Sequence, residues 1–490
     1  MTEKKNILFV IADDLGKYTG CYGVKSINTP NIDKLAAQGT RFDMAFASTA
    51  SCSASRSTIY TGLHTHQNGQ YGHEHDWNHF GTFDHVDTAP RLFNELGYQT
   101  GIIGKIHVAP DSVYPWEVRL GSSTRDITWF SEHVGQFLDK ARKTDRPFYL
   151  TVAYTDPHRD DTRGGFGNQQ IADPDITLPR YRPEDIAVPS FLSDVPEVRQ
   201  EMAEYYQAIV RLDAGVGLLI KSLEARGILD STLVCFTSDN GPPFLNSKST
   251  LFDAGVCLPL IVRKPGAKNG IENPNLVSWV DFLPTLLDWA GAKDHVPRDS
   301  KSPPRLGRSF LPILESSERL SNDKWEQQVF GSHTFHEIQN YWPTRFTRTT
   351  RFKYHRNIAY RLDFPFATDL YGSLSWDGIR NTKPPVYIGP RALKDYIFRP
   401  QEELYDLVND PQEVRNLAGE EAYENVLKEL REKTEAWQLK TKDPWMYRDG
   451  VSVIINQMYK MEGLKIPDRW ELDLERPGNR DSQPFLWPSS

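Results

Sequence analysis

The chain of 490 residues has little cysteine and lacks long hydrophobic runs. Its four cysteines are widely spaced, which excludes a disulfide framework; they are Cys21, Cys52, Cys235 and Cys257. The longest apolar run near its beginning covers residues 7–12, far fewer than the about 20 residues of a membrane-spanning helix. We therefore expect neither a disulfide-stapled fold nor a membrane protein.

Concentrated charge is also missing. The formal net charge is −8, and lysine and arginine are interspersed with aspartate and glutamate. No basic run predicts binding to nucleic acid, and no polybasic segment predicts binding to an anionic membrane. The sequence also lacks a signal-peptide hydrophobic region and any Asn-x-Ser/Thr sequon. We expect a cytoplasmic protein whose oligomeric state stays open, a homo-oligomer being one alternative.

Buried strands are predicted where apolar and β-branched residues run together, at residues 6–12, 98–105, 146–154 and 232–237. Such runs are typical of a parallel or mixed sheet with both faces covered. Helical spacing of apolar residues at 197–226 supplies one covering element. The pattern predicts an α/β fold, and the length allows two domains.

Polar side chains follow two of these strands. Asp13 and Asp14 come directly after residues 6–12, and Asp239 and Asn240 follow residues 232–237. In open α/β sheets, ligands bind beyond the carboxyl ends of the strands. Four oxygen-bearing side chains suit Ca²⁺ or Mg²⁺. The alternative for the aspartate pair is a helix cap or a turn.

One cysteine lies among small residues at the predicted start of a short helix. Cys52 would lie near that helix N-terminus, where backbone N–H groups favour an anion. Arg56 adds a cation about one turn further on, and Gly62 ends the helix. The alternative is a small buried cysteine in a loop.

Cations and imidazoles follow the other predicted strands. Lys105 and His107 lie two residues apart, on one side if the chain is extended. His158 follows residues 146–154; a solvent-exposed turn histidine is its alternative. Further histidines crowd one segment: His64, His66, His73, His75, His79 and His85. They show no clean helical metal spacing, so we favour the lining of an anionic substrate pocket over a dedicated zinc site.

These motifs together resemble the sulfatase family. Residues 52–56, Cys-x-Ala-Ser-Arg, followed by Thr-Gly at 61–62, match its signature, whose usual form has proline in place of Ala54. The Asp-Asp, Lys-x-His, Pro-His and Asp-Asn elements occur in the family's order. The resemblance implies an alkaline-phosphatase-like fold, with a large mixed β-sheet flanked by helices. It also implies a catalytic domain at residues 1–365 and a smaller C-terminal α+β domain at 366–490.

The resemblance further implies how the site works. A formylglycine-generating enzyme would oxidise Cys52 to Cα-formylglycine, the catalytic group. Ca²⁺, with Mg²⁺ as an alternative, would be held by residue 52 together with Asp13, Asp14, Asp239 and Asn240. The implied catalytic residues are Cys52, Arg56, Lys105, His107, His158 and Lys248. His107 would be a base, and His158 or Lys248 would act on the leaving group.

Segments 66–72, 113–115 and 329–337 are similar to the sulfamidase subgroup. They imply a small anionic substrate such as an N-sulfated glucosamine, although an alkyl or aryl sulfate would use the same catalytic core. His336, Glu337 and Arg345 are candidate substrate contacts, with ordinary surface polarity as the alternative. Two other functions stay open: a phosphonate or phosphodiester hydrolase of the same superfamily, and a non-catalytic binder of sulfated ligands with unmodified Cys52.

Overall fold

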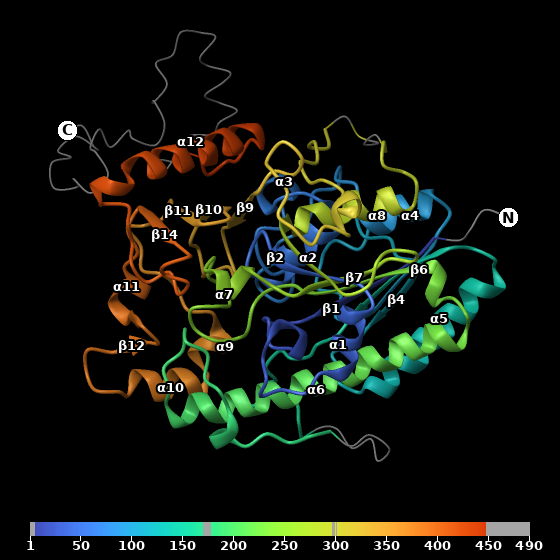
Figure 1. Cartoon of the computed structure of the whole chain (residues 1–490), viewed down its shortest axis with the longest axis horizontal. Helices are drawn as coiled ribbons and strands as arrows, with labels where there is room; N and C mark the ends of the chain where they lie inside the picture. Colours follow the sequence, from blue (N-terminus) through green and yellow to red (C-terminus); the bar gives the residue numbers. More distant parts are fainter. Residues whose placement is uncertain (1–4, 170–177, 296–298, 300, 447–490) are drawn as a thin grey trace, which may run out of the picture.

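A large mixed sheet forms the centre of the molecule (Figure 1). The computed structural model describes residues 5–169, 178–295, 299 and 301–446. Eight strands pair in the order β4-β3-β5-β1-β6-β7-β2-β8. Their bounds are β1 Asn6–Ala12, β2 Thr40–Phe46, β3 Gln99–Gly104, β4 Val118–Gly121, β5 Phe148–Ala153, β6 Thr232–Ser238, β7 Leu260–Arg263 and β8 Ile271–Ser278. The predicted α/β class and the mixed sheet are confirmed.

The direction of the strands decides where the site can form. β3, β5, β1 and β6 are neighbours and run parallel, whereas β7 is antiparallel to both β6 and β2. The four parallel strands therefore end side by side at one edge of the sheet. Each carries a predicted site residue just beyond its carboxyl end.

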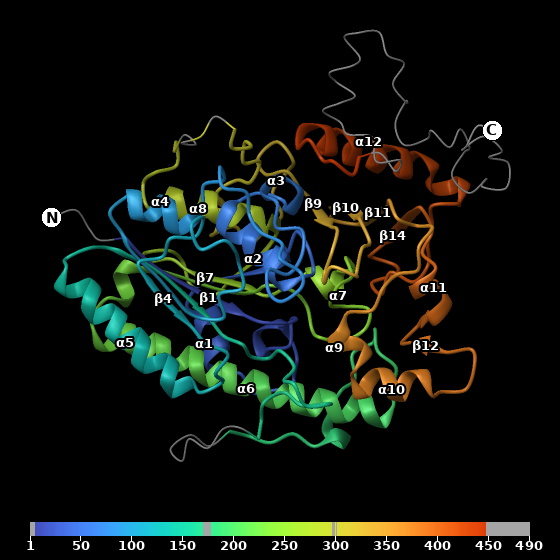
Figure 2. The same cartoon turned by 180° about the vertical axis from the view of Figure 1, so that it is seen from behind.

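Two apolar layers hold helices against the sheet. In β1, Leu8 and Val10 enter one layer and Ile7 and Phe9 enter the other, as alternation along a strand requires. Each such buried side chain contributes about 1.5–3 kcal/mol. The helices α1 (Pro30–Ala37), α5 (Ile127–Lys143) and α6 (Pro196–Ala225) cover one face, and α2 (Cys52–Thr61), α4 (Ala89–Glu95) and α8 (Phe282–Trp289) cover the other (Figure 2).

A second, antiparallel sheet lies beside the first (Figure 1). Its order is β14-β11-β10-β9, with β9 Gln328–His333, β10 Thr344–Thr349, β11 Phe352–Asn357 and β14 Glu402–Asp406. Helix α12 (Glu424–Lys440) packs on it through Leu427 and Leu430. The sheet takes strands from both sides of residue 365, and the domain boundary expected there stays a prediction.

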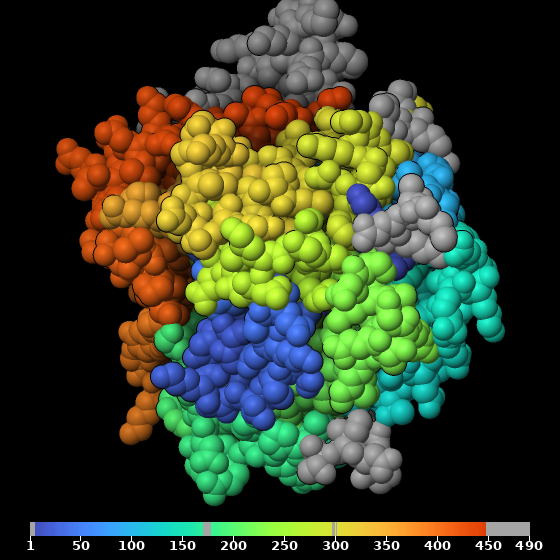
Figure 3. All heavy atoms as spheres, turned by 45° about the vertical axis from the view of Figure 1, so that its right-hand side comes forward, coloured from blue at the N-terminus to red at the C-terminus, as the bar shows by residue number. Residues whose placement is uncertain are grey.

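The described chain also contains short α-helices and strands: α3 Thr65–Asn68, α7 Asp253–Val256, α9 Thr368–Tyr371, α10 Leu374–Arg380, β12 Tyr387–Ile388, β13 Arg391–Ala392 and α11 Leu393–Ile397. In Figure 3, the blue N-terminal segment packs between green and yellow segments from the middle of the chain. Among the described residues, no helix has both the length and the apolar character that crossing a membrane requires.

Candidate active site

Four oxygen-bearing side chains meet where β1 and β6 end. These strands pair through Ala12 and Ser238, which places the residues that follow them side by side. The Asp14 backbone N–H donates to Asp239 Oδ1 at 3.1 Å, and Asn240 Nδ2 donates to Asp14 Oδ1 at 2.6 Å. Asp13 completes the group, and all four residues are fully buried.

Cys52 is the first residue of α2 and points its thiol at this group. Its Sγ lies 3.8 Å from Asp14 Oδ1, and the residue is 1% exposed. One turn further on, Arg56 Nε donates to Asp239 Oδ2 at 2.9 Å, and an Arg56 Nη lies 3.7 Å from Asp13 Oδ1. Burial raises the pKa of the Cys52 thiol, so the unmodified side chain is not a ready thiolate nucleophile.

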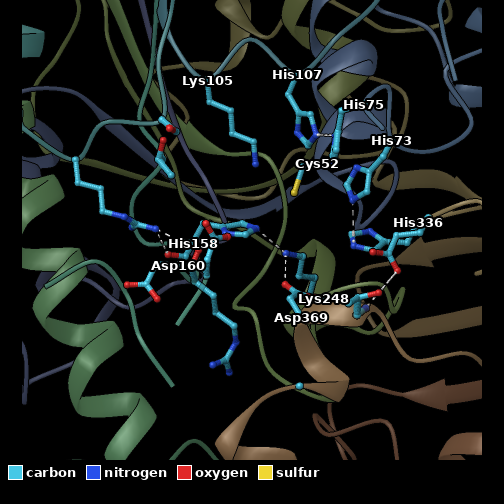
Figure 4. Close-up of a pocket in the computed structure, with 18 of the residues that line it drawn as sticks. Cys52, His73, His75, Lys105, His107, His158, Asp160, Lys248, His336 and Asp369 are labelled. Carbon is cyan, nitrogen blue, oxygen red and sulfur yellow. Dashed lines mark hydrogen bonds and ion pairs between the residues drawn. The ribbon is translucent and has the colours of Figure 1, made fainter. Parts of the chain in front are cut away.

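The turn after β3 supplies a second cation and an imidazole. Gly104 has a φ of +100°, and the Lys105 Nζ that follows it lies 2.5 Å from Asp13 Oδ2. His107, with a φ of +53°, points into the same space, and its Nε2 lies 2.8 Å from His75 Nδ1. Lys105 and His107 therefore both reach the region of Cys52 (Figure 4).

Lys248 and His158 form a hydrogen-bonded pair beside the aspartates. Lys248 Nζ lies 2.9 Å from Asp14 Oδ2, 2.6 Å from Asp369 Oδ2 and 3.1 Å from His158 Nε2. His158 Nδ1 lies 2.6 Å from the Arg159 carbonyl oxygen. Because a carbonyl oxygen only accepts, Nδ1 carries the hydrogen and Nε2 accepts from Lys248.

The carboxylate group fits a hard divalent cation. Asp13 Oδ1 and Asn240 Oδ1 are buried and have no hydrogen-bond partner among the described residues. Burial and the nearby charge of Asp13 raise the pKa of Asp14 to about 6 and that of Asp239 to about 7, although neighbouring cations act in the opposite direction. For Asp13, burial again acts to raise the pKa, but the surrounding positive charges, led by Lys105, together outweigh it and lower the pKa. Negatively charged carboxylates that repel one another in this way are stabilised by a divalent cation that binds oxygen ligands, such as Ca²⁺ or Mg²⁺.

A cavity of about 1020 Å³ opens in front of Cys52 (Figure 4). Its lining includes the predicted residues Cys52, Lys105, His107, His158, Lys248, His336 and Glu337. His336 Nδ1 lies 3.0 Å from Ser51 Oγ, and Glu337 Oε2 accepts from Thr368 Oγ1 at 2.7 Å. The structure thus brings two of the three candidate substrate contacts to the cavity.

Arg345, the third candidate, is not among the residues that line the cavity. It is fully buried on β10, and its guanidinium donates to the two carboxylate oxygens of Asp443 at 2.6 and 2.8 Å. It also donates to the backbone carbonyl of His333 at 2.9 Å. In this structure Arg345 joins β10 to the segment that follows α12.

Sequence reasoning missed Asp369, which reaches the site from α9. Its carboxylate pairs with Lys248, and it lines the cavity. An aspartate near the start of a four-residue helix has many ordinary explanations. No local signal could therefore have selected it.

A cysteine at a helix N-terminus, a group of buried oxygen-bearing side chains and several cations thus meet at one edge of the mixed sheet. Solved structures share this fold. The phosphonate monoester hydrolase of Agrobacterium radiobacter has a TM-score of 0.65 at 19% identity, covering 89% of this chain and 96% of that one. A protein solved in complex with its substrate D-glucosamine-2-N,6-O-disulfate has a TM-score of 0.63 at 21% identity, covering 90% and 98%.

The Sulfatase family model matches residues 5–292, and the chain belongs to the sulfatase family. The N-sulphoglucosamine sulphohydrolase of Homo sapiens is 36% identical over 474 residues, which cover 91% of this chain and 92% of that protein. The protein is therefore an enzyme, a hydrolase of the class that acts on sulfate esters and sulfamates.

Proposed function

We propose that this sulfatase hydrolyses the sulfamate of an N-sulfated glucosamine. The observation that carries the proposal is the Lys248–His158 pair at the cavity beside Cys52. A sulfamate leaves as an amine and needs a proton on its nitrogen, which such a pair can supply. The name of the human relative and the sulfated glucosamine in one related structure support the same substrate class.

Residue 52 is proposed to be Cα-formylglycine, formed by a formylglycine-generating enzyme. Hydrated, this aldehyde supplies a hydroxyl nucleophile toward sulfur, and a divalent cation lowers the pKa of that hydroxyl. Asp13, Asp14, Asp239 and Asn240 would hold the cation, which we take to be Ca²⁺, with Mg²⁺ as the alternative. The buried Asp13 Oδ1 and Asn240 Oδ1, which have no hydrogen-bond partner among the described residues, support this assignment.

The chain's own cations would stabilise the reacting group. Arg56 is fixed by Asp239, Lys105 by Asp13, and Lys248 by Asp14, so each charge is held without further reorganisation. Positive charges that are already in position around a sulfuryl group lower the free energy of the transition state for its transfer. His107, beside residue 52, would take a proton from the hydroxyl.

We assign the proton donor role to Lys248. Burial and the neighbouring lysine lower the pKa of His158 to about 3, so the proton shared by the pair resides on Lys248. His158, fixed through Nδ1 by the Arg159 carbonyl, orients that lysine. Lys248 is also held in its charged form by Asp14 and Asp369, although burial opposes this.

Two measurements test the function. Mass spectrometry of the peptide that contains residue 52, from protein made in its native host, should show formylglycine. Release of sulfate from N-sulfoglucosamine should then be faster than hydrolysis of an aryl phosphodiester. Faster phosphodiester cleavage would favour the phosphonate or phosphodiester hydrolase. Unmodified Cys52 without turnover would favour the non-catalytic binder.

A further inference from the structure

Four histidines from three separate parts of the chain meet at one wall of the cavity (Figure 4). His73 and His75 come from the segment after α3, His107 from the turn after β3 and His336 from the segment after β9. The ring centroids lie 4.7 Å apart for His75 and His107, 5.0 Å for His73 and His107, and 4.1 Å for His73 and His336. This histidine cluster is distinct from the carboxylate group that suits Ca²⁺.

The ring nitrogens of the cluster have metal-like spacing. One nitrogen from each of His73, His75 and His107 lies within 4.8 Å of the other two. The closest of these contacts is 2.8 Å, between His107 Nε2 and His75 Nδ1. A tetrahedral zinc ion with Zn–N bonds of about 2.0–2.1 Å separates its ligand nitrogens by about 3.3 Å. Small side-chain rotations would therefore bring the three nitrogens onto one ion.

Oxygen atoms lie near the second nitrogen of two of these rings, an arrangement that is common around metal-binding histidines. His75 Nε2 lies 3.6 Å from Asp76 Oδ2, on the side away from its contact with His107. His73 Nδ1 lies 3.4 Å from Ser53 Oγ, while its Nε2 faces His336 Nε2 at 3.1 Å. Histidine ligands commonly use their second nitrogen in this way, toward a carboxylate or another oxygen acceptor.

Three of the four rings are held in the neutral form. Burial lowers the pKa of His73, His107 and His336 well below the ordinary value. The cations Lys105 and Lys248 lower the pKa of His73 and His336 further, and Lys105 does so for His107. An ion would replace the hydrogen bond between His107 Nε2 and His75 Nδ1, and the donor ring of that bond would carry its hydrogen on its other nitrogen instead. Three imidazoles suit Zn²⁺, Cu²⁺, Ni²⁺ or Co²⁺ and not Ca²⁺ or Mg²⁺, which bind oxygen.

We propose that His73, His75 and His107 form a binding site for a transition-metal dication such as Zn²⁺, and that its occupancy inhibits the enzyme. Inhibition follows because the ion would take up the lone pair of His107 and hold that ring away from its role as a base. The binding step stands on the geometry alone, whereas the inhibition rests on the proposed function.

The binding test uses the full-length protein with saturating Ca²⁺, so that the carboxylate site is filled. Titration with Co²⁺ should give the visible absorption of a tetrahedral nitrogen site, and Zn²⁺ should displace it at one equivalent. His75→Gln changes an exposed ring and should leave the fold intact. Loss of an outer-shell partner already costs about 10–100-fold in metal affinity, so losing a direct ligand should weaken Co²⁺ and Zn²⁺ binding by at least about tenfold.

His79→Gln is the matched control, an exposed histidine of the same segment outside the cluster, and should bind as the wild type does. Absence of a Co²⁺ signal in the Ca²⁺-loaded wild type, or equal affinity in His75→Gln, would overturn the site. Zn²⁺ should also lower turnover, which is normalised for each variant to its rate without zinc. The fractional loss of turnover should be smaller in His75→Gln than in His79→Gln. Equal inhibition of the two would overturn the inhibitory role. If the enzyme shows no turnover, the proposed function is refuted, but the Co²⁺ titration still tests whether the histidine cluster binds a metal ion.

Discussion

Lys248 is held by three polar side chains at once. It contacts Asp14, His158 and Asp369 within 3.1 Å, and its side chain is 2% exposed. A lysine with so little freedom can present its proton in one direction. The contribution of Lys248 to the rate should therefore increase with the pKa of the leaving group, because a more basic leaving group depends more on protonation.

Lys248→Ala should lower kcat/KM by roughly 10²–10⁴-fold for leaving groups of high pKa, the range typical of a lost general acid. The loss should be small for aryl sulfates whose phenols are acidic, because these leave without protonation. A series of aryl sulfates of graded acidity measures this slope. His158→Ala should act in the same direction but less strongly. A loss that is uniform along the series would reject the donor role.

Asp369 acts through Lys248 and is a positioning residue. Asp14 and Asp369 hold the pKa of Lys248 above its ordinary value, against the effect of burial. Removing one negative charge in Asp369→Asn should therefore lower the pKa of Lys248. The alkaline limb of the pH profile of kcat/KM should move to lower pH, while Asp363→Asn, an exposed neighbour, should leave it in place. An unshifted limb with lowered turnover would contradict this coupling.

At the scale of elements, the end of β3 shows how a strand positions a reactive group. Gly104 turns the chain toward Lys105 with a φ of +100°, and a Cβ there would lie 2.1 Å from the Ala153 carbonyl oxygen on β5. The close approach of two strands and the positive φ both require glycine. The position of Lys105 therefore depends on a residue that has no side chain.

Gly104→Ala should destabilise the fold by more than the about 1–2 kcal/mol of a left-handed backbone, because the clash adds to it. It should also lower kcat, since β3 and Lys105 must shift. Gly97→Ala is the matched control: Gly97 has a φ of +81°, and an added Cβ would meet no described atom within 4 Å, so only the backbone cost applies. Chemical denaturation and turnover measure both effects. Equal stability and turnover in the two variants would argue against the role of this turn.

The sequence predicted the individual strands better than the contacts between segments that are distant in the chain. Runs of apolar residues identified β1, β3, β5 and β6, and polar residues at their ends identified Asp13, Lys105 and Asp239. These signals are local, because a buried strand and its exit are encoded within about ten residues. The histidine cluster, Asp369 and the buried pair of Arg345 arise from contacts between distant segments. Neither spacing nor composition records such contacts.

At the scale of the whole molecule, buried ion pairs join the second sheet to the segments around it. Asp443 follows α12, and Arg345 lowers its pKa although burial acts in the opposite direction. The pKa of Asp443 is therefore lower in the folded state than in the unfolded state. The stabilisation that its ion pair with Arg345 contributes is present above about pH 4 and is lost as the pH falls further.

Arg345→Met should lower the free energy of unfolding by about 3–5 kcal/mol at neutral pH, because Asp443 is left buried without its partner. The difference from the wild type should shrink below about pH 4. The KM of the folded variant should stay unchanged, since Arg345 does not line the cavity. Urea unfolding at two pH values and steady-state kinetics measure these outcomes. A raised KM at unchanged stability would return Arg345 to the substrate site.

The order of the site residues along the chain has a consequence for biosynthesis. Cys52 is enclosed by groups that are made much later: Asp239 and Lys248 follow it by 187 and 196 residues, and His336 by 284. At a translation rate of about 5–20 residues per second, Asp239 emerges about 10–40 s after Cys52. Until then the thiol lacks the neighbouring charges of Asp239 and Lys248. The maturation enzyme proposed above would thus have a time window, set by the ribosome, that closes when β6, β7 and β8 join the sheet.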